Sequence, residues 1–363
     1  MRPTPRAAGF TLIELLVAMA VLAIFIVAIL GLLDSSQRVA KTESALADTQ
    51  ENVRYAAYHL LRTTRMAGAS AMPFAQTVGG ADYWLAARMW TNPGAFTDEF
   101  GGTRTSVAGS DVLVVRGFFE HSPFFVTVAN VDVAGMKVTV NERNAAHTLT
   151  QDMDVLAGQL TGLGLVLMGR GQYAVAQISG NTAASGTAPD RFFTITFADP
   201  AAPWHDLNPI DLATGDPDYT YGSATAPFDV YRVGILDSYT YYVSTDFQLR
   251  RVRHGADEPV AVNIGSLQCA LGVDNDGNGS VDQWYDQPTV AQAAPPPPPS
   301  VITFPAPIAI RITVLGRTAD PVMGWLEPRE TFNTVEDLSD GVVNRGCKWR
   351  LMRVTATLRD YVL

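Results

Sequence analysis

An apolar run near the N-terminus constrains this chain more than any other feature. Phe10 to Leu33 is 24 residues long and contains one charged side chain, Glu14. At a rise of about 1.5 Å per residue, such a helix spans roughly the 30 Å hydrocarbon core of a bilayer. A carboxylate at the centre of a membrane helix costs on the order of 2.5–3.5 kcal/mol. The run therefore predicts a membrane helix, and Glu14 needs an explanation.

Two ordinary kinds of N-terminal segment leave Glu14 unexplained. A cleaved signal peptide fits the basic residues Arg2 and Arg6, but the apolar run is too long and no A-x-A-like site ends it before Asp34. A plain signal anchor would keep both arginines in the cytoplasm and send the rest of the chain across the membrane. It accounts for the orientation but gives the carboxylate no role.

The residues around Glu14 suggest a third explanation. Gly9-Phe10-Thr11-Leu12-Ile13-Glu14 closely resembles the prepilin cleavage motif of type IV pilins and type II secretion pseudopilins. The resemblance implies that residues 1–9 are a leader, that prepilin peptidase cuts after Gly9, and that the new amine of Phe10 is methylated. Glu14 would then lie about one turn from that amine. Because a buried charge is tolerated when paired, the resemblance implies that Glu14 binds the amine of a neighbouring subunit during assembly.

The helical pattern continues beyond the apolar run. Residues 34–66 contain neither Gly nor Pro, and apolar side chains recur every seven residues at Val39, Leu46, Val53 and Leu60. This spacing predicts an amphipathic helix over 34–68 that follows a membrane or filament-core helix over 10–33. A coiled-coil dimer is the weaker alternative, because the stripe lacks a clear second apolar position.

The sequence pattern of the remainder, residues 69–363, is typical of a β-rich head. Apolar residues make up 47% of the chain and charged residues 17%, which indicates a folded protein. Short β-rich runs separated by Gly, Pro, Asn and Asp predict antiparallel strands near 111–116, 124–131, 136–140, 164–168, 173–178, 192–197, 239–243, 308–315 and 349–358. Residues 293–300 include five consecutive prolines and predict a stiff connector. The expected fold is α+β, with a long N-terminal helix packed on an antiparallel head.

Three later segments are similar, in order, to the PilW family of minor pilins. They are 51–68 at the end of the helix, 109–116 as a first head strand, and 265–282 as a late strand with an acidic loop. The resemblance implies a subunit that helps to initiate or cap a type IV pilus. It also implies an inner-membrane location with a periplasmic head and a place in the filament near its tip. The implied partners are other minor and major pilins, prepilin peptidase, the assembly platform and a tip adhesin.

The acidic loop itself resembles the first half of an EF-hand calcium loop. Asp274, Asp276, Asn278, Ser280 and Asp282 occupy ligand positions, and Gly279 stands where that loop turns. Position 12, normally Glu, is Tyr285, with Asp286 next. The alternative is a β-hairpin turn rich in Asp, Asn and Gly. A structural calcium ion is therefore a candidate ligand, and no cofactor is expected to be required.

Two cysteines, Cys269 and Cys347, suggest one disulfide if the head is translocated, and otherwise two buried thiols. The five histidines are His59, His121, His147, His205 and His254, and none stands at metal-pair spacing with another. The sequence contains no G-x-S-x-G, H-E-x-x-H or P-loop motif. We therefore expect no enzymatic activity.

Charge and length leave two other functions open. The net charge of -10 argues against nucleic-acid binding by the bulk surface. Arg250, Arg251 and Arg253 form a local basic strip, so a minor pilin of a DNA-uptake pilus remains an alternative, although a solvated strand or turn explains the strip more simply. A J-type pseudopilin of type II secretion shares every N-terminal feature, but the head is long for that role.

Overall fold

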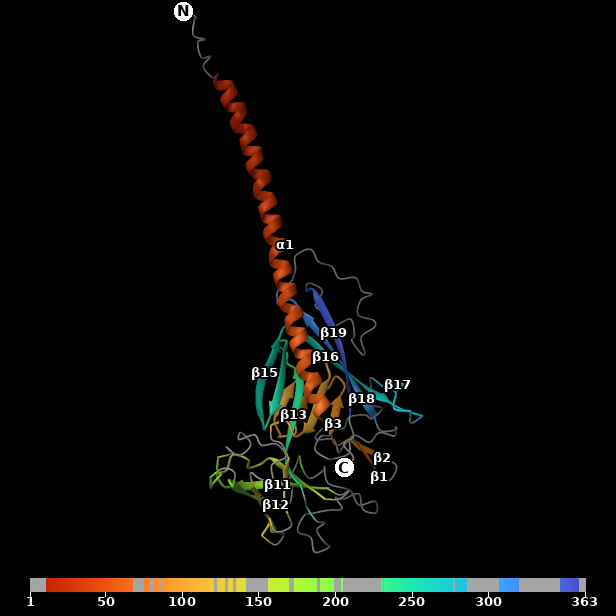
Figure 1. Ribbon diagram of the computed structural model, residues 1–363. Helices are drawn as coiled ribbons and strands as arrows, with labels where there is room; N and C mark the ends of the chain where they lie inside the picture. Colours follow the sequence, from red (N-terminus) through yellow and green to blue (C-terminus); the bar gives the residue numbers. More distant parts are fainter. Residues whose placement is uncertain are drawn as a thin grey trace, which may run out of the picture.

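The computed structural model consists of one long helix that projects from a β-rich head (Figure 1). All strand pairs are antiparallel within the described part of the chain. The expected α+β fold, a long N-terminal helix on an antiparallel head, is confirmed. The described residues are 11–67, 75–78, 81–84, 86–120, 123–127, 130–132, 135–141, 156–169, 173–187, 190–198, 204, 230, 232–276, 278–285, 307–319 and 347–358.

Helix α1, Leu12–Met66, continues unbroken from the apolar run into the amphipathic segment. Every residue from 11 to 40 is exposed. Below that level, one face of the helix is buried against the head, at Leu46, Thr49, Val53, Ala56, Ala57, Leu60, Thr63 and Thr64. The predicted stripe is therefore correct from Leu46 onward but wrong at Val39, which is 58% exposed because it lies in the stretch that projects beyond the head.

The helix packs on a four-stranded sheet with the order β17-β16-β18-β19. These strands are β16 (Ile264–Val273), β17 (Gln283–Tyr285), β18 (Pro307–Arg317) and β19 (Trp349–Thr357). Gly316 permits the close approach, since a Cβ atom there would lie 2.1 Å from Cγ2 of Val53 and 3.2 Å from Cγ2 of Thr49. Any larger residue at position 316 would push the helix off the sheet.

A larger sheet completes the part of the head next to the helix. It contains β3 (Ala87–Trp90), β6 (Val112–Gly117), β14 (Gln248–Arg253), β15 (Ala256–Val262) and the second half of β13 (Arg232–Val243). One apolar core joins this sheet, the four-stranded sheet and the helix; Val53, Leu60, Leu113, Leu267 and Ile312 belong to it. We call this part, together with the helix from Leu46, the proximal lobe.

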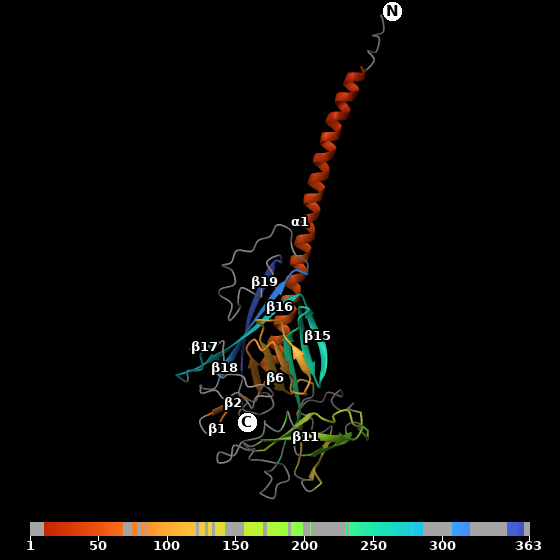
Figure 2. The same ribbon diagram turned by 180° about the vertical axis from the view of Figure 1, so that it is seen from behind.

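The same sheet continues into a second lobe at the end of the head farthest from the N-terminus of α1 (Figures 1 and 2). Its strands are β7 (Phe124–Phe125), β8 (Val131–Asp132), β9 (Lys137–Asn141), β10 (Gly164–Met168), β11 (Tyr173–Asn181), β12 (Phe192–Ala198) and the first half of β13. A separate core fills it, with Phe124, Leu165, Phe193 and Ile235 among its members. We call residues 118–236 the distal lobe.

The pairing of β6 with β13 shows how the two lobes are connected. Gly117 lies opposite Asp237, and Leu113 lies opposite Tyr241. Without residues 118–236, the two strands would therefore form a simple hairpin. The distal lobe is an insertion whose two ends leave the proximal lobe side by side.

The observed strands agree only in part with the strands predicted from the sequence. The run 124–131 is not one strand, because the chain forms β7 and only the first residue of β8 within it. The predicted strand 239–243 is the second half of the twelve-residue β13. The sequence also missed β3, β14, β15 and two small hairpins, β1–β2 (Ala75–Val78 and Ala81–Trp84) and β4–β5 (Ala95–Thr97 and Thr103–Thr105). The Pro-rich segment 293–300 lies outside the described residues.

Candidate assembly site

The first turn of α1 positions Glu14. Thr11 is the N-cap, and its Oγ1 accepts a hydrogen bond from the backbone N–H of Glu14 at 3.4 Å. In return, Oε2 of Glu14 accepts hydrogen bonds from the backbone N–H and the hydroxyl of Thr11, both at 2.9 Å. This capping box holds the carboxylate over the helix N-terminus, where the helix dipole favours negative charge. Gly9 and Phe10 lie outside the described residues.

The rest of the apolar run is exposed along the whole helix surface. α1 is long and apolar enough to cross a membrane, and none of the apolar window is buried in the protein. Leu12, Ile24, Val27 and Leu32 are each at least 70% exposed. A continuous apolar surface of this extent requires cover from lipid or from other helices. It suits a membrane-anchored subunit.

The acidic loop lies between β16 and β17. Ligand oxygens of Asp274, Asp276 and Asp282 lie within 4.8 Å of one another, so the structure brings together the three predicted carboxylates. Backbone N–H groups already approach this cluster: Gly279 donates to Asp274 at 2.6 Å, and Asn278 donates to both Asp274 and Asp276. Gly279 has φ +81°, the left-handed conformation expected at the sharp turn of such a loop.

The other two predicted ligands take part in the loop itself. The Asn278 side chain donates to Asp276 at 2.8 Å and accepts from the backbone N–H of Ser280 at 2.7 Å. Tyr285, at the position that should carry Glu, lies on β17 and donates to Gln283 at 3.0 Å. Three convergent carboxylates fit the preference of calcium for oxygen ligands, and an incomplete ligand set weakens the fit. Calcium binding remains a prediction.

The predicted disulfide is not present, since Cys269 and Cys347 are both buried thiols. Strand register gives the reason. Cys269 lies opposite Ile312, which lies opposite Val354 on β19. Cys347 precedes Val354 by seven residues, which corresponds to about 23 Å along an extended strand. A disulfide requires Cα atoms roughly 4.4–6.8 Å apart, so the two cysteines cannot meet.

The basic strip is neutralised by acidic neighbours. Arg250 pairs with Asp257 at 2.8 Å and Arg251 with Glu258 at 2.5 Å, across the β14–β15 hairpin. Arg253 pairs with Glu120 at the start of the distal lobe. The hydrogen bond from Arg251 lowers the pKa of Glu258 and so keeps that carboxylate charged. Phosphate binding by these arginines would have to break the pairs, which favours the simpler interpretation of a strand or turn, and the arginines do lie on strand β14.

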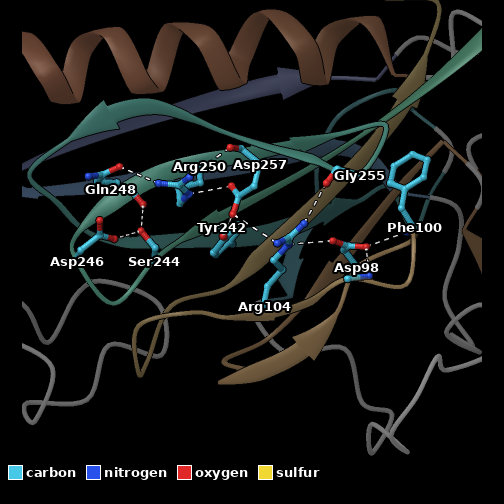
Figure 3. Close-up of polar contacts among 11 residues, drawn as sticks. Asp98, Phe100, Arg104, Tyr242, Ser244, Asp246, Gln248, Arg250, Gly255 and Asp257 are labelled. Atoms are coloured by element: carbon cyan, nitrogen blue, oxygen red, sulfur yellow. Dashed lines mark hydrogen bonds and ion pairs between the residues drawn. The ribbon is translucent and has the colours of Figure 1, made fainter.

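A further polar network holds the β4–β5 hairpin on the sheet (Figure 3). Arg104 contacts Asp98 at 3.0 Å, donates to the carbonyl of Gly255 at 3.1 Å and lies 3.8 Å from Asp257. Tyr242 donates to Asp257 at 2.7 Å, and burial with this bond raises the pKa of Tyr242 to about 12. The sequence did not predict this network, because its members are spread over about 160 residues.

A second group that the sequence missed joins α1 to the sheet. Nε2 of His59 lies 3.1 Å from the hydroxyl of Tyr241, which donates to Thr63 at 3.3 Å. Burial lowers the pKa of His59, and the charges of Arg251 and Arg62 lower it further. The arrangement positions the helix against the sheet and keeps His59 neutral near pH 7.

Comparison with known proteins gives a family match at the start of the chain. A family described as "Prokaryotic N-terminal methylation motif" matches residues 4–30, a segment that includes Gly9, Phe10 and Glu14. The match covers the N-terminal part of the chain alone. Among solved structures, the chain is similar to the type IV-like pilin TTHA1219 from Thermus thermophilus, at 13% identity over 55% of this chain and 84% of that one, with a TM-score of 0.21. No curated protein matches the chain.

Proposed function

We propose that this protein is a minor pilin of the PilW type, which helps to initiate or cap the assembly of a type IV pilus. The observation that carries the proposal is the methylation motif, which runs directly into a helix whose residues 11–40 are all exposed. A helix that leaves so much apolar surface uncovered must place it in a bilayer or among other helices. Pilin subunits do both in turn, first as membrane proteins and then in a filament.

The proposal includes a location and a set of partners. Arg2 and Arg6 would hold the N-terminus in the cytoplasm, so the single span would place the head in the periplasm. Prepilin peptidase would cut after Gly9, and the assembly platform would then pass the subunit into a filament, near its tip. Its neighbours there would be other minor pilins, the major pilin and a tip adhesin. The role is structural rather than catalytic.

Glu14 has a specific task in this proposal. The carboxylate of Glu14 lies in the first turn of α1 and is hydrogen-bonded to Thr11. Thr11 would be the second residue of the cleaved chain, directly after the new N-terminal Phe10. In a filament it would give up its hydrogen bonds to Thr11 for the amine of a neighbouring subunit. Glu14→Ala should leave insertion and cleavage intact and lower the pilus yield. Wild-type pilus numbers in that strain would contradict the task assigned to Glu14.

The deciding experiment uses a strain that lacks this gene. Surface pili are sheared off and quantified, and secreted proteins are profiled in parallel. Lost pili with normal secretion would support the proposal that this chain is a minor pilin. Normal pili with depleted secretion indicate a J-type pseudopilin instead. Normal pili and secretion with lost transformation would indicate a DNA-uptake pilus, which the paired arginines of β14 make less favourable.

A further inference from the structure

The tip of the loop between β16 and β17 contains Asn278 followed by Gly279, which is the only Asn-Gly pair in the sequence. In such a pair the backbone nitrogen of the second residue can attack the side-chain amide of the first, and glycine has no side chain to shield that nitrogen. Both residues are exposed, and a Cβ atom built on Gly279 would meet no atom within 4 Å. The attacking nitrogen and the amide are therefore both accessible.

A hydrogen bond assigns a base to this attack. The backbone N–H of Gly279 donates to Oδ2 of Asp274 at 2.6 Å. An amide nitrogen becomes a nucleophile only as it loses its proton, and a carboxylate aligned with that proton can accept it. Asp274 directly follows β16, and the loop is closed behind it by a bond from the N–H of Asp282 to the carbonyl of Val273 at 2.9 Å. The strand pairing thus holds the base in place.

The side-chain amide of Asn278 is held by two further hydrogen bonds. Its Oδ1 accepts from the backbone N–H of Ser280 at 2.7 Å, and its Nδ2 donates to Asp276 at 2.8 Å. These partners fix which atom is the oxygen, because a backbone N–H only donates and a carboxylate only accepts. The N–H of Ser280 polarises the carbonyl and would stabilise the negative charge that develops on Oδ1 during attack. A base and an oxyanion donor therefore surround one amide.

We propose that Asn278 is a site of spontaneous deamidation that the folded loop accelerates. The nitrogen of Gly279 forms a bond to Cγ of Asn278, the bond from Cγ to Nδ2 breaks, and Nδ2 leaves as ammonia. The proton that Asp274 accepts from Gly279 passes to the departing nitrogen, so atoms and charge balance. Water then opens the cyclic imide at either of its two carbonyl carbons, which leaves aspartate or isoaspartate at position 278.

The product carries more charge than the loop that is synthesised. Ligand oxygens of Asp274, Asp276 and Asp282 already lie within 4.8 Å of one another, and deamidation adds a fourth carboxylate beside them. Carboxylates at this distance repel one another, so each would hold a proton or a cation more strongly. The charge of the loop would thus depend on the age of the molecule, whatever its role in pilus assembly.

Mass spectrometry of the full-length chain in detergent tests the proposal, with a chelator present to keep cations out of the loop. Near neutral pH, the peptide that contains Asn278 should gain the mass of an NH group replaced by O, as both aspartate and isoaspartate. The folded chain should react roughly tenfold faster than the same chain unfolded in guanidinium, in which Asp274 is no longer held at the amide. Equal or slower reaction in the folded chain would overturn the proposal. So would aspartate without isoaspartate, which indicates direct hydrolysis.

Two substitutions separate the base from the charge of the cluster. Asp274→Asn removes the carboxylate that contacts Gly279 and should slow the folded chain by roughly tenfold. Asp282→Asn removes the same charge, but Asp282 accepts from the backbone N–H of Asn275 at 2.8 Å, so the rate should stay nearly unchanged. Neither variant creates another Asn-Gly pair, which Asp276→Asn would do. Equal rates in the two variants would overturn the proposal, and the comparison of folded with unfolded wild type needs neither of them.

Discussion

The two lobes of the head share strand β13, but their cores contain different kinds of side chain. The distal core consists of apolar residues such as Leu165, Phe193 and Ile235. In the described residues, every buried polar or charged side chain lies outside 118–236 and therefore in the proximal lobe, including Asp98, Asp111, Arg116 and Asp237. Apolar packing tolerates substitution if volume is kept, whereas buried charges depend on particular partners.

This difference separates two tasks. The proximal lobe has to bind one helix in one register, and buried polar pairs accept few alternatives. The described residues of the distal lobe contain no such buried polar pair, and its core is apolar. We therefore expect the proximal lobe to be sensitive to changes in single polar residues and the distal lobe to be sensitive mainly to lost volume.

Removal of the distal lobe is the largest change that tests this separation. Residues 121–235 would be excised and Glu120 joined to Leu236 through two glycines. Because β6 and β13 pair directly, and the backbone N–H of Glu120 donates to Asp237 at 3.2 Å, the cut ends already lie close together. The shortened chain in detergent should keep a cooperative thermal transition by circular dichroism. Loss of that transition would mean that the lobes are interdependent.

Glu99→Ala should cause the largest loss from a single substitution. Glu99 accepts hydrogen bonds from Arg116 and Ser238, and the side chains of Glu99 and Arg116 are 3% and 4% exposed. Removing the carboxylate leaves the guanidinium buried without this counter-charge, which typically costs about 3–5 kcal/mol. Chemical denaturation measures the change. The double variant Glu99→Leu with Arg116→Met is the control and should lose less, because no charge is left behind.

Leu165→Ala should cost about 2–5 kcal/mol, because this side chain is fully buried in the distal core. Hydrogen exchange followed by mass spectrometry should show faster exchange in β10 to β12 and little change in α1. The matched substitution in the proximal core, Leu267→Ala, should speed exchange in the proximal lobe and leave β10 to β12 largely unchanged. Equal effects in both lobes from either variant would refute two separate cores.

The smallest expected effect concerns pH. The pKa of His59 is lowered in the folded protein, chiefly by burial, so the unfolded chain takes up a proton first as the pH falls below about 6.5. Stability should therefore be complete above that pH and decrease below it. The melting temperature at pH 7.5 and at pH 5.5 should differ less in His59→Gln than in the wild type. An identical pH dependence in both proteins would assign the loss to other groups.

Local features of the sequence predicted the helix and most apolar strands. The stripe from Leu46 follows from the spacing of apolar residues, and the place of Glu14 in the first turn follows from the resemblance to the prepilin motif. The β14–β15 hairpin was missed because its arginines and acids suggest a solvated segment, whereas their charges cancel across the turn. The insertion of the distal lobe and the separation of Cys269 from Cys347 depend on which strands pair, and pairing between distant segments leaves no local pattern.

The position of β18 and β19 late in the chain has a consequence for the order of events during synthesis. The distal lobe is complete once residue 236 has emerged, but the strands that cover α1 end only at residue 357. If the head crosses a membrane as proposed, α1 therefore lacks its main cover, β18 and β19, for most of the translocation, although β6 and β15 also contact it. Part of the apolar face of α1, including Val53 beside Gly316, would then stay exposed to other apolar surfaces until β18 and β19 have formed.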